Sequence, residues 1–160
     1  MKIETNRNLL YGLAPIADTY SEILILGSMP GQESLDKQEY YAKNTNAMWR
    51  IIADIFNNGV SFTNYSEKVK CLHENHIAMW DTLKTCERKG SLDSAIRNEE
   101  YNDIHGFLQQ HPKIRKVIAN GAKAAKAIPN DINFIQAGST SAAHAVKYER
   151  KLAEWRELLK

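Results

Sequence analysis

The chain has 160 residues, 43% of them hydrophobic and 25% charged, which suits one compact core, so we expect residues 1–160 to form a single domain. No apolar run approaches the roughly 20 residues that a membrane-spanning helix needs, and residues 1–10 are too polar for a signal peptide, so we expect a cytoplasmic protein without membrane contact. The net charge of +2 neither demonstrates nor excludes binding to nucleic acid.

The first clear element is an aliphatic run over residues 23–26, which predicts a strand buried on both faces. It leads into residues 27–31, Gly-Ser-Met-Pro-Gly, which we call the first loop. This loop resembles an anion-binding loop, but it has neither the Lys-Ser/Thr of a P-loop nor GxGxxG spacing. Taken alone, it is better explained as an ordinary turn after a strand.

The next segment, residues 38–49, is polar yet rich in aromatic residues. Tyr40 and Tyr41 offer a flat π surface on which an extruded base could stack, and the amide of Asn46 can hydrogen-bond a base edge or hold a water molecule. The alternative is a helix N-terminus, with Thr45 or Asn46 as the cap of a helix that contains Trp49. Capping and function are compatible here.

Strand and helix patterns alternate through the rest of the chain. Residues 77–80, 117–119 and 133–135 predict three more strands, and apolar residues at helical spacing predict helices that include residues 49–56, 104–108 and 148–159. This order predicts a single three-layer α/β/α domain with a central, mostly parallel four-stranded sheet and helices on both faces. Open parallel sheets bind ligands beyond the carboxyl ends of their strands, so the loops there should converge.

Several other polar residues lie at predicted strand ends or helix starts. Ser139 and Ser141 lie between a strand and the last helix, where hydroxyls can hold a phosphate or simply cap the helix. Asp81 ends a predicted strand and could act as a general base, although a carboxylate there is more often a structural cap. Ser91 is expected to cap a helix start.

The cysteines and histidines do not predict a metal site. Cys71, His73, His76 and Cys86 match no usual zinc-finger spacing, and two cysteines are too few for an iron–sulfur cluster. In a reducing compartment we expect both cysteines to be free thiols, and we expect no metal and no cofactor.

Taken together, these segments resemble the hypoxanthine-DNA glycosylase branch of the uracil-DNA glycosylase superfamily over nearly the whole chain. The matching stretches are residues 23–31 with 34–35, 40–42 with Asn46 and Trp49, 77–81, 86–88 with 90–94, Asn120-Gly121, and 139–141. The resemblance implies a monomeric, monofunctional DNA glycosylase that flips a deaminated base, hypoxanthine before uracil, out of DNA and hydrolyses its glycosidic bond in base excision repair.

The resemblance also implies roles for individual residues. Asn46 is the expected catalytic residue. The residues expected to bind the base are Gly27, Ser28, Met29, Pro30, Gly31, Tyr40, Tyr41, Trp49 and Asn120. The residues expected to bind DNA are Ser139, Thr140, Ser141, Ala143 and His144.

The first-loop position where other branches carry a carboxylate or asparagine falls at or beside Met29. The chain departs from the family pattern in two motifs: Lys43-Asn44-Thr45-Asn46 replaces an Asn-Pro-Arg-Asn-like or His-Pro-Arg-Asn-like run, and the final motif has lost both prolines and carries His144 in place of an amide. Two other interpretations therefore stay open. One is a superfamily member with weak or no activity that binds DNA or a nucleotide, and the other is a doubly wound domain that binds a mononucleotide or flavin.

Overall fold

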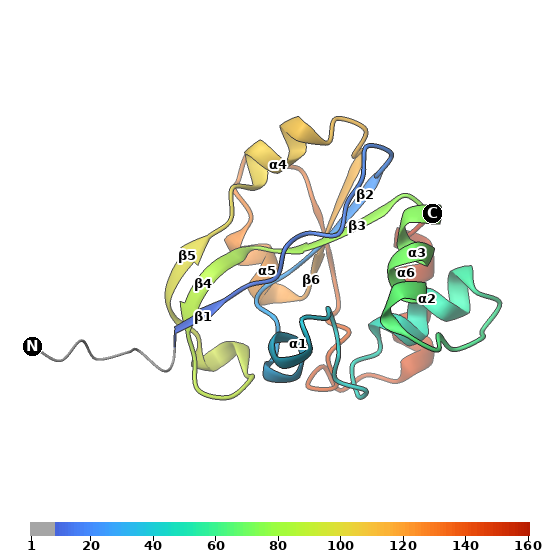
Figure 1. The fold of residues 1–160 in the computed structure, drawn as a ribbon, viewed down its shortest axis with the longest axis horizontal. Coiled ribbons are helices and arrows are strands. Elements are labelled where there is room, and N and C mark those ends of the chain that lie inside the picture. The colour runs from blue at the N-terminus through green and yellow to red at the C-terminus, as the bar shows by residue number, and fades with distance from the viewer. Residues whose placement is uncertain (1–8) are drawn as a thin grey trace, which may run out of the picture.

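A central parallel sheet organises the computed structural model, which describes residues 9–160. Its four strands, β2 (Ile23–Gly27), β3 (Ile77–Asp81), β6 (Lys116–Asn120) and β7 (Ile135–Ala137), lie in the order β3-β2-β6-β7 (Figure 1). The four-stranded parallel sheet is thus confirmed. The last strand begins two residues later than predicted, because its pairing with β6 starts where Ile118 faces Ile135.

Helices cover both faces of this sheet, as predicted. The helices α2 (Met48–Phe56), α3 (Tyr65–Glu74) and α6 (Tyr148–Leu158) lie on one face, and α4 (Ile104–Gln110) and α5 (Ala122–Ala127) lie on the other (Figure 1). Side chains alternate along a strand, so Ile23 and Ile25 of β2 pack under the first group while Leu24 and Leu26 pack under the second. The aliphatic run is therefore continuous because both faces of β2 are buried.

A second, antiparallel sheet was not predicted. It contains β1 (Leu9–Tyr11), β4 (Leu83–Glu87) and β5 (Arg97–Tyr101), in the order β1-β4-β5. Sequence patterns missed β5 because its residues, Arg-Asn-Glu-Glu-Tyr, show no alternation of apolar and polar side chains. The connection between β4 and β5, residues 88–96, contains the short 3-10 helix η1 (Asp93–Ala95), and we call it the hairpin loop.

The hairpin loop packs against the first loop and against α1 (Gln32–Lys37), the helix that follows it. Ser91 does not cap a helix in its own segment, because η1 has Leu92 as its N-cap. Its hydroxyl instead accepts the N–H of Gln32, the first residue of α1, at 2.9 Å. A distant serine thus satisfies one of the open N–H groups of α1.

Two expectations about absent features concern only part of the chain. Within residues 9–160, every helix falls short of the length and apolarity that a membrane crossing requires. In that same part of the chain, no three His, Cys, Asp or Glu side chains come together as metal ligands, and Cys71 and Cys86 are both free and buried. The expectation that residues 1–10 are not a signal peptide falls mostly on residues 1–8, which lie outside the described residues.

The central sheet gives the first test of the fold. Leu24 is fully buried in β2, so we predict that Leu24→Ala lowers the free energy of unfolding by about 2–5 kcal/mol through lost burial and a new cavity. Leu92→Ala, at a side chain that is 65% exposed, should change it by less than about 0.5 kcal/mol. Urea denaturation measures both, and equal losses would contradict the assignment of β2 to the core.

Candidate functional site

The loops after β2, β6 and β7 converge at the lower edge of the sheet in Figure 1, as the parallel arrangement predicted. Asn120, at the end of β6, joins them. Its side-chain N–H groups donate to the Tyr41 hydroxyl at 3.1 Å and to the Thr140 hydroxyl at 3.0 Å, and its side-chain oxygen accepts the Thr140 N–H at 3.0 Å. These bonds use both side-chain N–H groups of Asn120 and tie it to Tyr41 and Thr140, and the expectation that Asn120 binds the base stays a prediction.

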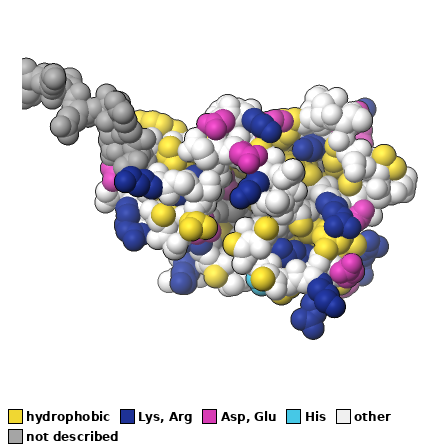
Figure 2. All heavy atoms as spheres, turned by 90° about the horizontal axis from the view of Figure 1, so that it is seen from below, with side chains coloured by type: hydrophobic (Ala, Val, Ile, Leu, Met, Phe, Trp, Pro, Cys, Tyr) yellow, Lys and Arg dark blue, Asp and Glu magenta, His cyan; other side chains and the backbone are white. Residues whose placement is uncertain are grey.

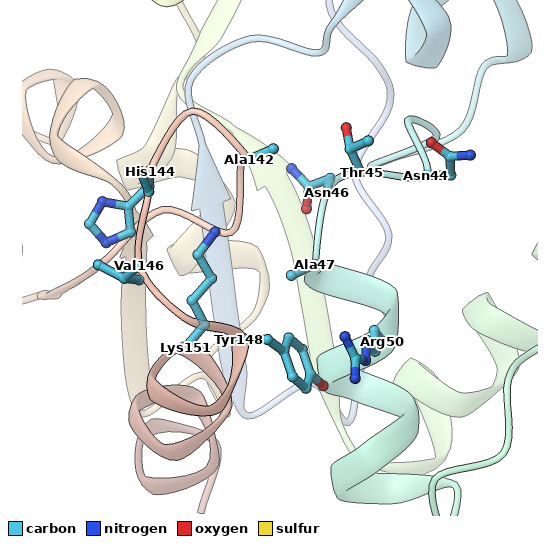
Figure 3. Close-up of a pocket in the computed structure, with 11 residues that line it drawn as sticks. Asn44, Thr45, Asn46, Ala47, Arg50, Ala142, His144, Val146, Tyr148 and Lys151 are labelled. Atoms are coloured by element: carbon cyan, nitrogen blue, oxygen red, sulfur yellow. The ribbon is translucent and has the colours of Figure 1, made fainter.

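Asn46 lies just before α2 and both fixes the helix start and faces a cavity. Its side-chain oxygen accepts the Met48 N–H at 2.9 Å, at the first residue of α2. The next residue, Ala47, donates its N–H to the Thr140 carbonyl at 2.9 Å. With the oxygen held, the amide nitrogen of Asn46 is turned toward Ala142 (Figure 3). Ala142 belongs to residues 138–147, between β7 and α6, which we call the strand-end segment. The N-cap of α2 is Ala47, so Asn46 is not the cap itself, although its side chain holds the first N–H of the helix; its catalytic role stays a prediction.

The cavity beside Asn46 has a volume of about 340 Å³ and opens between two segments of the chain. It is lined by Asn44, Thr45, Asn46, Ala47, Arg50, Ala142, His144, Ala145, Val146, Tyr148 and Lys151. Among these residues are the cations Arg50 and Lys151 and no carboxylate, which favours an anionic occupant. No residue of the first loop lines this cavity, so it does not by itself form the predicted pocket between Asn46 and that loop.

Two of the expected base-binding residues belong to the core. Tyr40 is only 4% exposed, and its hydroxyl donates to the Ala14 carbonyl at 2.8 Å. Trp49 is 7% exposed, donates its indole N–H to the Tyr40 carbonyl at 2.8 Å and packs edge-on against Phe62. The expectation that Tyr40 and Trp49 contact the base is therefore wrong, because both rings are buried and hydrogen-bonded inside the protein.

Tyr41 is less buried than its neighbour, and its expected role in stacking on a base stays a prediction. It is half-buried, and its backbone has φ 52°, in the left-handed region that a bulky residue seldom adopts. Burial raises the pKa of its hydroxyl, and the nearby Asp81 carboxylate adds to the shift. Such local strain persists where surrounding contacts enforce it, and here the Asn120 hydrogen bond does so.

The first loop turns its side chains into the protein. The Ser28 hydroxyl donates to Asp93 at 2.9 Å, the Met29 side chain packs in a small core with Leu83, and the Pro30 carbonyl accepts from Arg88 at 2.6 Å. The predicted contribution of this loop to binding must therefore come from its backbone.

The loop backbone is held by its carbonyls. The Gly27 carbonyl accepts the Thr82 N–H at 2.9 Å, and the Ser28 carbonyl accepts the Leu83 N–H at 3.1 Å. Within residues 9–160 no peptide bond is cis, and in a planar trans peptide the N–H points opposite to the carbonyl. The N–H groups of Ser28 and Met29 are therefore directed away from the segment that binds those carbonyls.

The serines of the last motif do not cap the last helix. Lys147 is the N-cap of α6, and the Ser139 and Ser141 hydroxyls accept the N–H groups of residues 141 and 143, at 3.1 and 3.2 Å. Thr140 is fully buried and bonded to Asn120, so the expectation that it contacts DNA is wrong. Ala143 and His144 are exposed, with the His144 ring pointing away from Asn46 (Figure 3).

Asp81 is the residue whose importance sequence reasoning underestimated. It is 4% exposed, and one carboxyl oxygen lies against Gly27, where an added Cβ would stand only 2.5 Å from it. The other oxygen has no hydrogen-bond partner among the residues that the structure describes, so Asp81 is not the structural cap considered above. Burial raises the pKa of Asp81 to about 7; Asp93 adds to the shift and Arg88 opposes it. The only sequence signal was a carboxylate ending an otherwise apolar strand.

Comparisons with known proteins identify the family. The family model of the uracil DNA glycosylase superfamily matches residues 15–159. A hypoxanthine DNA glycosylase of Methanosarcina acetivorans is 40% identical over 118 residues, which are 74% of this chain and 75% of the relative. A hypoxanthine DNA glycosylase of Methanosarcina barkeri is 35% identical over the same shares of the two chains.

A solved structure shows the same architecture. The solution NMR structure of a candidate uracil DNA glycosylase from Methanosarcina acetivorans superposes with a TM-score of 0.82 and 34% identity, covering 94% of this chain and 96% of the other. The fold and the named relatives are therefore those of a DNA N-glycosylase. The chain belongs to the uracil DNA glycosylase superfamily.

The raised pKa of Asp81 predicts how stability depends on pH. Between its usual pKa of 3.8 and the folded value of about 7, the folded state holds a proton that the unfolded state has lost, so this contribution to stability disappears as pH rises. From pH 5 to pH 8, the wild type should lose about 2.5 kcal/mol of unfolding free energy relative to Asp81→Asn, which does not titrate. Urea denaturation of both proteins at the two pH values measures this, and parallel losses would contradict it.

Proposed function

We propose that this protein removes hypoxanthine, and less readily uracil, from DNA by hydrolysing the N-glycosidic bond, as a step of base excision repair. The observation that carries the proposal is the placement of the Asn46 amide, fixed through Met48 and facing a cavity that is lined by cations and no carboxylate. The names of the two Methanosarcina relatives support hypoxanthine as the preferred base.

The chemistry does not require a strong nucleophile. Glycosidic bond hydrolysis passes through an oxocarbenium-like sugar while negative charge grows on the departing base. Hydrogen-bond donors that already point at the base stabilise that charge. We assign this work to the N–H groups of the first loop, with Tyr41 stacked on the base.

Asn46 then serves the other reactant. It faces a cavity that no residue of the first loop lines, so we assign its amide to holding the attacking water while the loop holds the base.

DNA binding is assigned to the same edge of the sheet. Figure 2 shows the molecule from below, the side on which this edge of the sheet lies, and Lys and Arg side chains are spread over that face. Arg50 stacks over the Tyr148 ring at 3.6 Å, and Lys151, only 7% exposed, donates to the Ser141 carbonyl at 2.9 Å. We propose that Lys151 stiffens the strand-end segment while Ser139 and Ser141 contact backbone phosphates and Ala143 or His144 approaches the stack vacated by the flipped base.

Asn46 gives the direct test of catalysis. Asn46→Ala should lower the single-turnover rate on a duplex with deoxyinosine by about 100- to 1,000-fold, the usual loss for one preorganised donor. Asn46→Asp keeps the oxygen that accepts the Met48 N–H but removes the N–H donor, so it separates catalysis from helix capping. Alkali cleavage of the abasic product measures the rate.

The control is Asn130→Ala, at an exposed asparagine outside the cavity, which should keep a rate within about threefold of wild type. Unchanged rates for both Asn46 variants would reject its catalytic role. A wild-type protein that binds the lesion duplexes but cleaves neither deoxyinosine nor deoxyuridine would favour the non-catalytic interpretation.

The phosphate contacts can be tested by affinity. Replacing both Ser139 and Ser141 with Ala should weaken binding to lesion-containing duplex at least about tenfold, since hydrogen bonds to charged groups contribute roughly 1.5–3 kcal/mol each. Fluorescence anisotropy at one fixed salt concentration measures the affinity. Ser66→Ala, at an exposed serine of α3, is the matched control, and equal affinities for all three proteins would show that the two serines do not bind phosphate.

A further inference from the structure

The first loop is fastened to the hairpin loop, a part of the second sheet. Two hydrogen bonds join them, the Ser28 hydroxyl to Asp93 at 2.9 Å and the Arg88 guanidinium to the Pro30 carbonyl at 2.6 Å. A third joins Gln32, the first residue of α1, to the hairpin loop, since its N–H donates to the Ser91 hydroxyl at 2.9 Å. The partners from the hairpin loop all lie within residues 88–93, and they bond to three of the five residues from Ser28 to Gln32. The geometry of the proposed base-binding loop is thus set by a segment outside the central sheet.

Arg88 is the central member of these contacts. It is 4% exposed, and it donates Nε to the Gly90 carbonyl at 2.8 Å and one terminal nitrogen to the Pro30 carbonyl. The other terminal nitrogen has no hydrogen-bond partner within residues 9–160. A buried cation with an unpartnered N–H is costly, and an apolar residue of similar size is often at least as stable in such a place.

The surroundings of Arg88 keep it charged and fixed. Its guanidinium lies within electrostatic reach of Asp81 and Asp93, which favour the charged form against the effect of burial. Gly90 has φ 74°, a conformation that suits glycine and lets the hairpin loop present its carbonyl to Arg88. The guanidinium plane is therefore held by two backbone carbonyls from different loops.

We propose that Arg88 is a positioning residue for base excision: by holding the Pro30 carbonyl, it directs the Gly31 N–H toward the leaving base. The inference rests on the proposed function. The peptide between Pro30 and Gly31 is planar and trans, so its N–H points opposite to the carbonyl that Arg88 holds. Pro30 itself has no N–H, which leaves the Gly31 N–H as the donor at this end of the loop.

The position of such a donor controls the rate more than the affinity. Its hydrogen bond strengthens as charge develops on the base, so a shift of about 1 Å can cost about 100-fold in rate. Arg88→Met should therefore lower the single-turnover rate at saturating enzyme by about 10- to 100-fold. The enzyme concentration that gives half-saturation should change by less than about threefold, because phosphate contacts dominate affinity.

Arg88→Lys tests the same idea with the charge retained. A lysine can donate to the Pro30 carbonyl but lacks the planar fork that bridges it to the Gly90 carbonyl, so its saturated rate should lie between those of Arg88→Met and the wild type. Lys89→Met, at the exposed neighbouring cation, should retain the wild-type rate. A purely structural role would lower the melting temperature and leave the saturated rate unchanged, so wild-type rates in the folded Arg88 variants would overturn the proposal.

A measurement without substrate keeps the test independent of activity. In ¹H–¹⁵N spectra, the Gly31 amide resonance should shift in Arg88→Lys and stay in place in Lys89→Met. An unshifted Gly31 resonance would overturn the proposal even if Arg88→Met fails to fold. If the wild-type protein cleaves no lesion duplex, the proposed function fails, whereas the Gly31 resonance still reports whether Arg88 sets the loop.

Discussion

The Asn120 amide holds the functional edge of the sheet together. It sits at the end of a central strand, where one planar side chain reaches Tyr41 on one side and Thr140 on the other. Thr140 in turn receives the N–H of Ala47, next to Asn46. Tyr41, Asn120 and Thr140 come from three different parts of the chain, and the planar Asn120 amide fixes the positions of these segments relative to one another. A polar network of this kind favours a single arrangement, because alternatives leave donors or acceptors without partners.

The site uses backbone and amide groups where other hydrolytic enzymes use charged side chains. The first loop has no ionisable residue, and its side chains bond or pack inward, so its chemistry is that of oriented peptide groups. The charged residues Asp81, Arg88 and Asp93 lie behind it, buried or hydrogen-bonded, and act on the loop from the protein side. Such an arrangement suits a reaction in which the main task is to stabilise charge on a departing base.

The sequence predicted β2, β3 and β6 well, since these strands are largely buried on both faces and are mostly apolar. It placed β7 less accurately, because that strand is short and mostly exposed. It also predicted that the loops at the carboxyl ends of the parallel strands converge. It failed where side-chain direction mattered: Tyr40 and Tyr41 are neighbours in sequence, yet only Tyr41 has the left-handed backbone that turns it toward Asn120. It also missed the second sheet, because β5 is polar and because β1, which pairs with β4, is distant from it in the chain.

The composition of β5 has a consequence for how the protein behaves in a crowded cell. This strand lies at an edge of the second sheet, where unpaired backbone groups could add a strand from another molecule and start aggregation. Arg97 and Glu100 are exposed on it, and Glu99 pairs with Lys123 of α5, so an incoming chain would have to bury several charges. The polar composition that kept β5 from being predicted thus also protects the open edge of the sheet against self-association.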